Sequence, residues 1–325
     1  MIVGFLTGGD PVTGMGHVFR CLALAELLRE AGVSVVFVMT GDEVAAALVR
    51  ERGLGPMLCW KDGPLPDGRW DALVVDRLSS DPALLATLKR RAGRLVVLDD
   101  TGLGHWVADV AVNGLYRCPV PRPAGSRTVS VGGLAYLAMA PGFAAQPFEV
   151  RPTIAALLVT QGGSDTYGLT PSLLQELRPW LARHPDVTVH VHTGPAFHHD
   201  AALTAASAGL PVVQHRRLPD MAGFMAGMDV AVAAGGVMAC ELAAVGVPSV
   251  LTTGEEKELE TTADLARHGG AVDLGRHGPD TGQRLAAALD DLSSAGRRRA
   301  CSGAARATVD GQGARRLLDL ILGRG

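Results

Sequence analysis

Short apolar runs alternate with segments of helical periodicity along the chain. In the first half these runs predict buried strands at residues 2–7, 33–39, 72–75, 95–98 and 110–112. Helices are predicted between them, including 21–28, 42–52 and one that opens with Asp81 as N-cap and Pro82 at its first position. Buried strands that alternate with helices imply a parallel sheet with right-handed crossovers.

Residues 117–151 interrupt this alternation. They are rich in proline and glycine, and we interpret them as an interdomain connection that carries a short strand at 128–131. The alternation then restarts, with strands predicted at 154–159, 187–192, 212–213, 230–233 and 248–252 and helices at 171–183, 218–228, 238–245, 259–268 and 313–322. The predicted fold class is therefore α/β with two doubly wound parallel-sheet domains, residues 1–145 and 146–325.

The composition fits two such domains and disfavours several classes of protein. The chain has 325 residues, 47% of them hydrophobic, and a net charge of −3 without a long basic run, so nucleic-acid binding is not expected. Five cysteines without a Cys-x-x-Cys pair are typical of a reducing cytoplasm, which is the expected location. No apolar stretch reaches about 18 residues, so no membrane span is expected, although a peripheral membrane contact stays open.

The first candidate site lies where the first strand meets the first helix. The segment 9–20 is rich in glycine, and His17 falls at the helix N-terminus, where the helix dipole favours a neutral imidazole that can act as a general base. Gly14 and Gly16 would let a ligand approach the backbone. A capping or packed histidine is the alternative. The segment is neither a dinucleotide fingerprint, because Phe19 replaces the third glycine, nor a P-loop, because it has no lysine.

Polar residues follow the predicted strands of the first domain at their carboxyl ends. They are Asp10, Asp76, Asp99 and Asn113. In open parallel sheets, ligands bind beyond the carboxyl ends of the strands. These side chains are therefore expected near a ligand.

Two glycine turns mark the second domain. Gly162-Gly163-Ser164 and Gly235-Gly236-Val237 each lie between a predicted strand and a helix, and their N–H groups could hold a diphosphate. Glu241 follows about one turn into the helix, where a carboxylate can accept hydrogen bonds from ribose hydroxyls. Ordinary tight turns between strand and helix are the alternative interpretation.

The histidines give only a weak indication of metal. His190 and His192 share one strand face, and His198-His199 follow, but no ligand set appears at a familiar spacing. The sequence also lacks Asp-x-Asp, which disfavours a cation on a diphosphate, and it lacks a Gly-x-Ser-x-Gly elbow. Neither a metal nor any other cofactor is expected.

Four motifs together resemble a known family. The stretch 14–25, Gly-Met-Gly-His-Val-Phe-Arg-Cys-Leu-Ala-Leu-Ala, is similar to the N-terminal motif of the UDP-sugar hydrolase of pseudaminic acid biosynthesis and of related spore-coat polysaccharide proteins. Residues 159–165 resemble that family's Gly-Gly-Thr-Asp turn, residues 234–241 its sugar-nucleotide turn, and residues 310–316 the start of its closing helix. The likeness covers almost the whole chain.

The resemblance implies a GT-B architecture, in which two facing Rossmann-like domains enclose the site in an interdomain cleft. His17 would be the catalytic base on the acceptor side, and the C-terminal domain would bind the UDP-sugar. Gly14, Gly16 and the two glycine turns would surround the UDP-sugar, Glu241 would hold the ribose, and Leu218 and Met221 would lie by the uracil.

The sequence departs from the hydrolase at positions that would face the sugar or its acceptor. Lys257-Glu258 replaces an Asn-Gln pair, Asp76-Arg77 replaces Asp-His, and Cys240 replaces a frequent Asn. Arg77 or Lys257 could pair with the carboxylate of a uronic acid donor, or both could be ordinary surface residues.

The resulting hypothesis is an inverting, metal-independent glycosyltransferase that moves a sugar from a UDP-sugar to a small acceptor. A nucleobase acceptor, as in the cytosylglucuronate synthases of nucleoside antibiotic biosynthesis, would suit a uronic acid donor. The alternatives are a UDP-sugar hydrolase, with His17 activating water, and a non-catalytic nucleotide-sugar binding protein. The oligomeric state stays open, with a homodimer among the alternatives.

Overall fold

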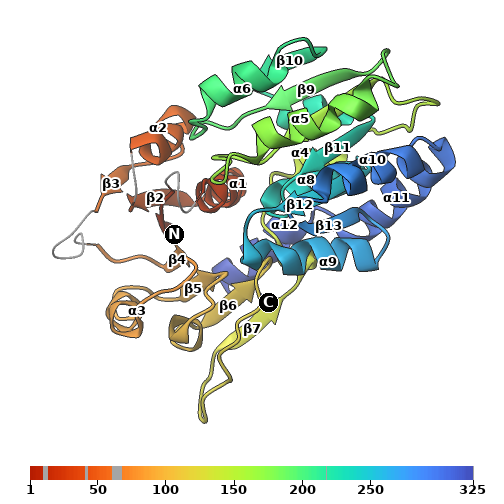
Figure 1. Cartoon of the computed structure of the whole chain (residues 1–325). Helices are drawn as coiled ribbons and strands as arrows, with labels where there is room; N and C mark the ends of the chain where they lie inside the picture. The colour runs from red at the N-terminus through yellow and green to blue at the C-terminus, as the bar shows by residue number, and fades with distance from the viewer. Residues whose placement is uncertain (10–13, 41–42, 61–67, 217, 325) are drawn as a thin grey trace. The chain divides into compact units, whose positions relative to one another are not determined.

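The computed structural model describes residues 1–9, 14–40, 43–60, 68–216 and 218–324. The chain divides into two compact units (Figure 1). The first unit comprises Met1–Pro141 together with Gly311–Gly325, and the second comprises Gly142–Asp310.

The first unit is built on a parallel sheet of seven described strands in the order β3-β2-β1-β4-β5-β6-β7. The strands are β1 (Ile2–Thr7), β2 (Ser34–Met39), β3 (Met57–Cys59), β4 (Ala72–Asp76), β5 (Leu95–Leu98), β6 (Val110–Asn113) and β7 (Val129–Gly132). All five residues of β4 are buried, which is the pattern of a central strand covered on both faces. The order places the carboxyl ends of β1, β4 and β5 side by side.

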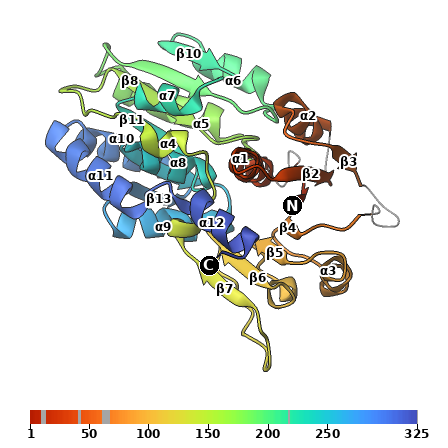
Figure 2. The same ribbon diagram turned by 180° about the vertical axis from the view of Figure 1, so that it is seen from behind.

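The helices of the first unit include one from the far end of the sequence. The unit contains α1 (Gly16–Glu30), α2 (Glu43–Arg52), α3 (Pro82–Lys89), α12 (Gly313–Leu322) and the 3₁₀ turns η1 (Leu103–Trp106) and η2 (Leu134–Tyr136). α12, blue in Figure 2, packs against α1 and η2. The contact is close, because a Cβ on Gly313 would lie 2.0 Å from the Leu137 carbonyl oxygen, and Arg316 donates to the carbonyl of Ala135 at 2.7 Å.

The second unit is built on a parallel sheet of six described strands in the order β10-β9-β8-β11-β12-β13. The strands are β8 (Ala156–Thr160), β9 (Thr188–His192), β10 (Val212–His215), β11 (Val230–Ala233), β12 (Ser249–Thr253) and β13 (Val272–Arg276). The helices are α4 (Gly142–Ala145), α5 (Leu169–Leu181), α6 (Asp200–Ser207), α7 (Met221–Ala226), α8 (Val237–Val245), α9 (Leu259–Arg267), α10 (Thr281–Leu292) and α11 (Ala295–Thr308), with the 3₁₀ turn η3 (Glu256–Glu258). The chain order reverses between β8 and β11, the kind of switch point at which α/β sheets bind ligands.

The structure differs from the predicted domain organisation in three ways. The division falls at Gly142 rather than at residue 146, because α4 packs against α8 and Arg306 donates to the carbonyl of Ala144. The last helix joins the first unit. Most of the predicted connection at 117–151 also belongs to the first unit, where it supplies the edge strand β7.

Among the described elements, two strands, β3 and β13, and three helices, α4, α6 and α10, were not predicted. The described helices include none that is long and apolar enough to cross a membrane.

Candidate functional site

The first candidate site begins where β1 leads into α1. Gly14 has a φ of +81°, a left-handed conformation that favours glycine, and Gly16 is the first residue of the helix. Met15 is the N-cap of α1, and its side chain makes no capping hydrogen bond. Asp10, the first of the predicted strand-end residues, lies outside the described residues.

His17 forms a close pair with Asp76, which ends the neighbouring strand β4. Its Nδ1 lies 2.6 Å from Asp76 Oδ1, and its side chain is 11% exposed. Because Asp76 is an ionised acceptor, Nδ1 must carry the proton that it donates. This assignment leaves Nε2 as the basic nitrogen, and the carboxylate holds the ring in that tautomer.

Arg20 lies one helical turn after His17 and joins it to two carboxylates. Its Nε donates to Asp76 Oδ2 at 2.5 Å, its Nη2 pairs with Asp76 Oδ1, and its Nη1 pairs with Asp99. Its Nη2 also lies 2.9 Å from His17 Nδ1. Burial alone would raise the pKa of the Asp76 carboxyl, but the charges of Arg20 and His17 and hydrogen bonds from both lower it to about 2.

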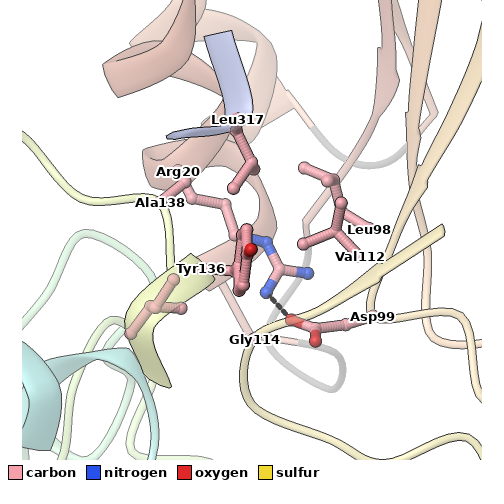
Figure 3. A pocket seen from close by; sticks show the side chains of 9 residues that line it. Arg20, Leu98, Asp99, Val112, Gly114, Tyr136, Ala138 and Leu317 are labelled. Carbon is pink, nitrogen blue, oxygen red and sulfur yellow. Dashed lines mark hydrogen bonds and ion pairs between the residues drawn. The ribbon is translucent and has the colours of Figure 1, made fainter. Parts of the chain in front are cut away.

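Asp99 is anchored from the other side of this cluster. It has a φ of +49°, and its Oδ1 accepts hydrogen bonds from the backbone N–H groups of Leu115 and Tyr116 at 3.0 and 3.4 Å. Figure 3 shows the Arg20 guanidinium reaching toward Asp99 beside Tyr136, with Leu317 of α12 on the same small pocket. The last helix therefore helps to enclose the buried arginine.

The position of Asp76 differs from the prediction that it faces the sugar or acceptor. It is fully buried beneath His17 and Arg20, and its carboxylate contacts these two side chains. Arg77, its neighbour, is half-buried and has no hydrogen bond or ion pair among the described residues. Asp99 was expected near a ligand, but the contacts of Arg20 with Asp76 and Asp99 were not predicted. The i, i+3 spacing of His17 and Arg20 and the strand-end positions of both aspartates could have indicated them.

The first glycine turn of the second unit is tightly packed. Gly162 has a φ of +77°, Ala196 N–H donates to the Gly163 carbonyl at 3.0 Å, and a Cβ on Gly194 would lie 2.3 Å from Gly163 Cα. The Ser164 hydroxyl is buried and lies 3.0 Å from the Thr166 hydroxyl. The turn is therefore held in one shape by its neighbours.

This turn does not lead directly into a helix, contrary to the predicted strand–turn–helix junction. α5 begins at Leu169, and the buried Asp165 carboxylate accepts from the N–H groups of Leu169 and Thr170 at 2.7 and 2.9 Å. An internal carboxylate thus occupies the positive end of α5, so a ligand at Gly162-Gly163 would meet the loop rather than that helix terminus.

The second glycine turn does open a helix. Gly236 is the N-cap of α8, has no side chain to cap it, and is followed by Val237 as the first helical residue. Its N–H groups form the kind of anion site that helix N-termini provide. Glu241 lies one turn into α8, is partly exposed, and has no hydrogen bond or ion pair among the described residues. Burial nevertheless raises the pKa of its carboxyl from 4.5 to about 8.

Glu258 packs directly against this second turn. A Cβ on Gly236 would lie 2.8 Å from Glu258 Oε1, the Gly235 N–H hydrogen-bonds the carboxylate, and the Thr253 hydroxyl pairs with Oε2. Lys257, the neighbouring cation, lies 2.5 Å from Glu255 and is therefore already paired.

The remaining predicted residues have mixed surroundings. Leu218 and Met221 are half-buried before and at the start of α7, whereas Cys240 is fully buried in α8 and cannot face a sugar as expected. His190 Nδ1 lies 3.1 Å from His215 Nε2, and His192 pairs with Thr160 at 3.2 Å. The described residues include no group of three or more histidine, cysteine, aspartate or glutamate side chains that could hold a metal ion.

Two curated proteins resemble the chain in sequence, while no family model matches it. The spore coat polysaccharide biosynthesis protein SpsG of Bacillus subtilis is 28% identical over 294 residues, which cover 85% of this chain and 84% of SpsG. An uncharacterised protein of Methanocaldococcus jannaschii is 23% identical over 290 residues, covering 82% of this chain. The match spans only 58% of that archaeal protein.

Solved structures resemble the whole chain. A putative UDP-N-acetylglucosamine 2-epimerase from Listeria monocytogenes has a TM-score of 0.67 at 13% identity and covers 100% of this chain and 96% of its own. Staphylococcus aureus MnaA, in a co-structure with UDP, has a TM-score of 0.67 at 12% identity, covering 99% and 96%. The calicheamicin glycosyltransferase CalG4 has a TM-score of 0.61 at 18% identity, covering 99% and 98%. With the two parallel-sheet units, these likenesses show that the chain has the GT-B fold.

Proposed function

We propose that the protein is a glycosyltransferase that uses a UDP-sugar and a small acceptor, with His17 as the general base. The observation that carries the proposal is the pair between His17 Nδ1 and the buried Asp76 carboxylate, because it leaves Nε2 free to take a proton. SpsG, a polysaccharide biosynthesis protein, and CalG4, a glycosyltransferase, agree with this class of activity.

In this proposal the second unit binds the nucleotide. The uncapped start of α8 holds the diphosphate, the Gly162-Gly163 loop contributes to the same site, and Glu241 accepts hydrogen bonds from the ribose. Leu218 and Met221 would contact the base. The UDP bound to MnaA supports UDP as the nucleotide.

The reaction would proceed with inversion at the anomeric carbon. His17 Nε2 takes the proton of the acceptor as the acceptor forms a bond to that carbon, and the bond to UDP breaks with its electron pair on the departing phosphate. The N–H groups at the start of α8 stabilise the charge that develops there, so the reaction needs no metal. The resulting imidazolium is stabilised by Asp76.

The matched pair of variants His17→Gln and His268→Gln tests the base. His268 is an exposed histidine on a different element, so it controls for loss of a histidine. We expect His17→Gln to lower the transfer rate about 10²- to 10⁴-fold while UDP binding persists, and His268→Gln to leave both unchanged. Full turnover by His17→Gln would contradict the proposed base.

A screen of UDP-sugars with and without acceptor identifies the donor and separates transfer from hydrolysis. Donor binding is measured as thermal stabilisation, with UDP-glucuronate compared against UDP-N-acetylglucosamine. Arg77, which has no ion pair with the residues that the structure describes, suits a uronic acid carboxylate. Rapid release of free sugar without an acceptor would instead indicate the hydrolase. Stabilisation without turnover would indicate a binding protein.

A further inference from the structure

The Glu258 carboxylate lies at the turn that the proposed function assigns to the diphosphate. One of its oxygens lies over Gly236, the N-cap of α8, and the Gly235 N–H hydrogen-bonds the carboxylate. The Glu258 carboxylate therefore lies at the positive end of α8, where the helix dipole favours a negative charge. A diphosphate at this helix start would add its negative charge beside that carboxylate.

The groups around Glu258 supply little positive charge to compensate a second anion. Thr253 of β12 and Gly235 before α8 donate hydrogen bonds, and both are neutral. Glu255, the residue before η3, adds negative charge, and Lys257 of η3 pairs with Glu255 at 2.5 Å and only partly offsets the charge of Glu258. No ion pair between Glu258 and a cation occurs within the described ranges. Like charges this close disfavour the doubly charged state, so one of them must be neutralised.

We propose that binding of a nucleoside diphosphate at the start of α8 is linked to uptake of one proton by Glu258, so that this residue sets the pH dependence of donor affinity. The inference rests on the proposed function, because it requires the diphosphate to bind at Gly235-Gly236. The proton comes from solvent and protonates Glu258, whose neutral carboxyl can then donate a hydrogen bond to a phosphate oxygen.

The free protein already favours this change. Burial raises the pKa of the Glu258 carboxyl, the charge of Glu255 raises it further, and the hydrogen bonds from Thr253 and Gly235 and the charge of Lys257 do not offset the rise. Ligand binding should therefore be tightest at low pH, where Glu258 is protonated, and should weaken as the pH rises.

Isothermal titration calorimetry with UDP tests the linkage. Glu258→Gln replaces the carboxylate by a neutral group of the same shape, and Glu256→Gln is its matched control, because Glu256 is an exposed residue of the same 3₁₀ turn. Titrations at pH 6 and pH 8 in buffers of different ionisation enthalpy measure the protons taken up. The terminal phosphate of UDP also titrates, so the difference between the two variants is the relevant quantity.

At pH 8 we expect Glu258→Gln to bind UDP roughly tenfold more tightly than wild type. Its binding should also be accompanied by the uptake of fewer protons, with a difference of at most one. Glu256→Gln should match wild type in both measurements. Equal proton uptake and equal Kd in all three proteins would overturn the inference but leave the proposed nucleotide site intact. Weaker binding by Glu258→Gln at both pH values would also overturn it. Absence of UDP binding by wild type would instead refute the nucleotide site itself. If Glu258→Gln does not fold, Glu258→Ala is the second variant, with the same expected loss of proton uptake.

Discussion

The starts of α1 and α8 are both helix N-termini that follow glycine-containing turns, yet their surroundings differ. At α1, His17 and Arg20 pair with two buried carboxylates, Asp76 and Asp99, inside the first unit. At α8, the turn has no side chains of its own, and Glu241 has no hydrogen-bond or ion-pair partner among the described residues.

In the proposed function, the start of α1 holds a side chain that is already oriented, whereas the start of α8 is a surface whose polar groups a ligand would bind. Under the same proposal, the carboxylate of Asp76 would fix the His17 tautomer before any substrate binds, so no free energy would be spent on orienting the base during the reaction. The Glu241 carboxyl instead has no hydrogen-bond or ion-pair partner among the described residues, and a ligand that supplies one gains that hydrogen bond. We therefore expect substitutions at α1 to affect folding and catalysis, and substitutions at α8 to affect ligand binding and its pH dependence.

The largest expected effect on stability comes from Arg20→Met. The change leaves Asp76 and Asp99 buried without their common cation, which should lower the free energy of unfolding by about 3–5 kcal/mol. Urea denaturation measures it. Arg50→Met is the matched control, because Arg50 pairs with Glu43 at 2.9 Å on an exposed surface and should cost less than about 1 kcal/mol. Equal losses of unfolding free energy in the two variants would show that the buried ion pairs of Arg20 stabilise the fold no more than an exposed pair does.

A smaller effect is expected at Gly194→Ala in the second unit. The added methyl group would collide with Gly163 Cα, so the glycine turn must shift, at a cost of about 1–3 kcal/mol in unfolding free energy. Gly303→Ala is the control, because nothing lies within 4 Å of its added Cβ in α11, and it should instead stabilise by up to about 1 kcal/mol. Thermal unfolding of both variants checks the expectation, which an unchanged Gly194→Ala protein would contradict.

The smallest expected effect is a pH dependence at Glu241→Gln. The folded-state pKa of about 8 lies above the ordinary value of 4.5. Wild type therefore loses stability as the pH rises through this interval, because Glu241 must ionise and has no partner within the described part of the chain. Glu241→Gln should match wild type near pH 5 and exceed it by on the order of 1 kcal/mol near pH 9. Thermal unfolding across this range, with Glu256→Gln as the exposed control, measures the difference. Parallel curves for wild type and Glu241→Gln would mean that Glu241 finds a partner in solution.

The elements that could be predicted from the sequence are those with a distinct local pattern of apolar residues or glycines. Central strands such as β4 and β11 are short apolar runs buried on both faces, and the glycines at 162 and 235–236 do lie in the loops after β8 and β11. The edge strand β3 was missed because its apolar run, Met57–Cys59, is only three residues long. The cap formed by Asp165 was missed because the three residues that separate it from the helix carry no periodicity that indicates their turn.

The amino-acid sequence by itself determined the two parallel sheets and put glycines, His17 and the strand-end carboxylates beside their carboxyl edges, because apolar periodicity and turn residues act over a few neighbouring positions. Only the tertiary structure decided which charges meet. Asp76 and Asp99 lie 56 and 79 residues from Arg20, and α12 packs on α1 from the other end of the chain. These ion pairs and helix contacts follow from strand order and helix packing, and they cannot be predicted from the pattern of neighbouring residues.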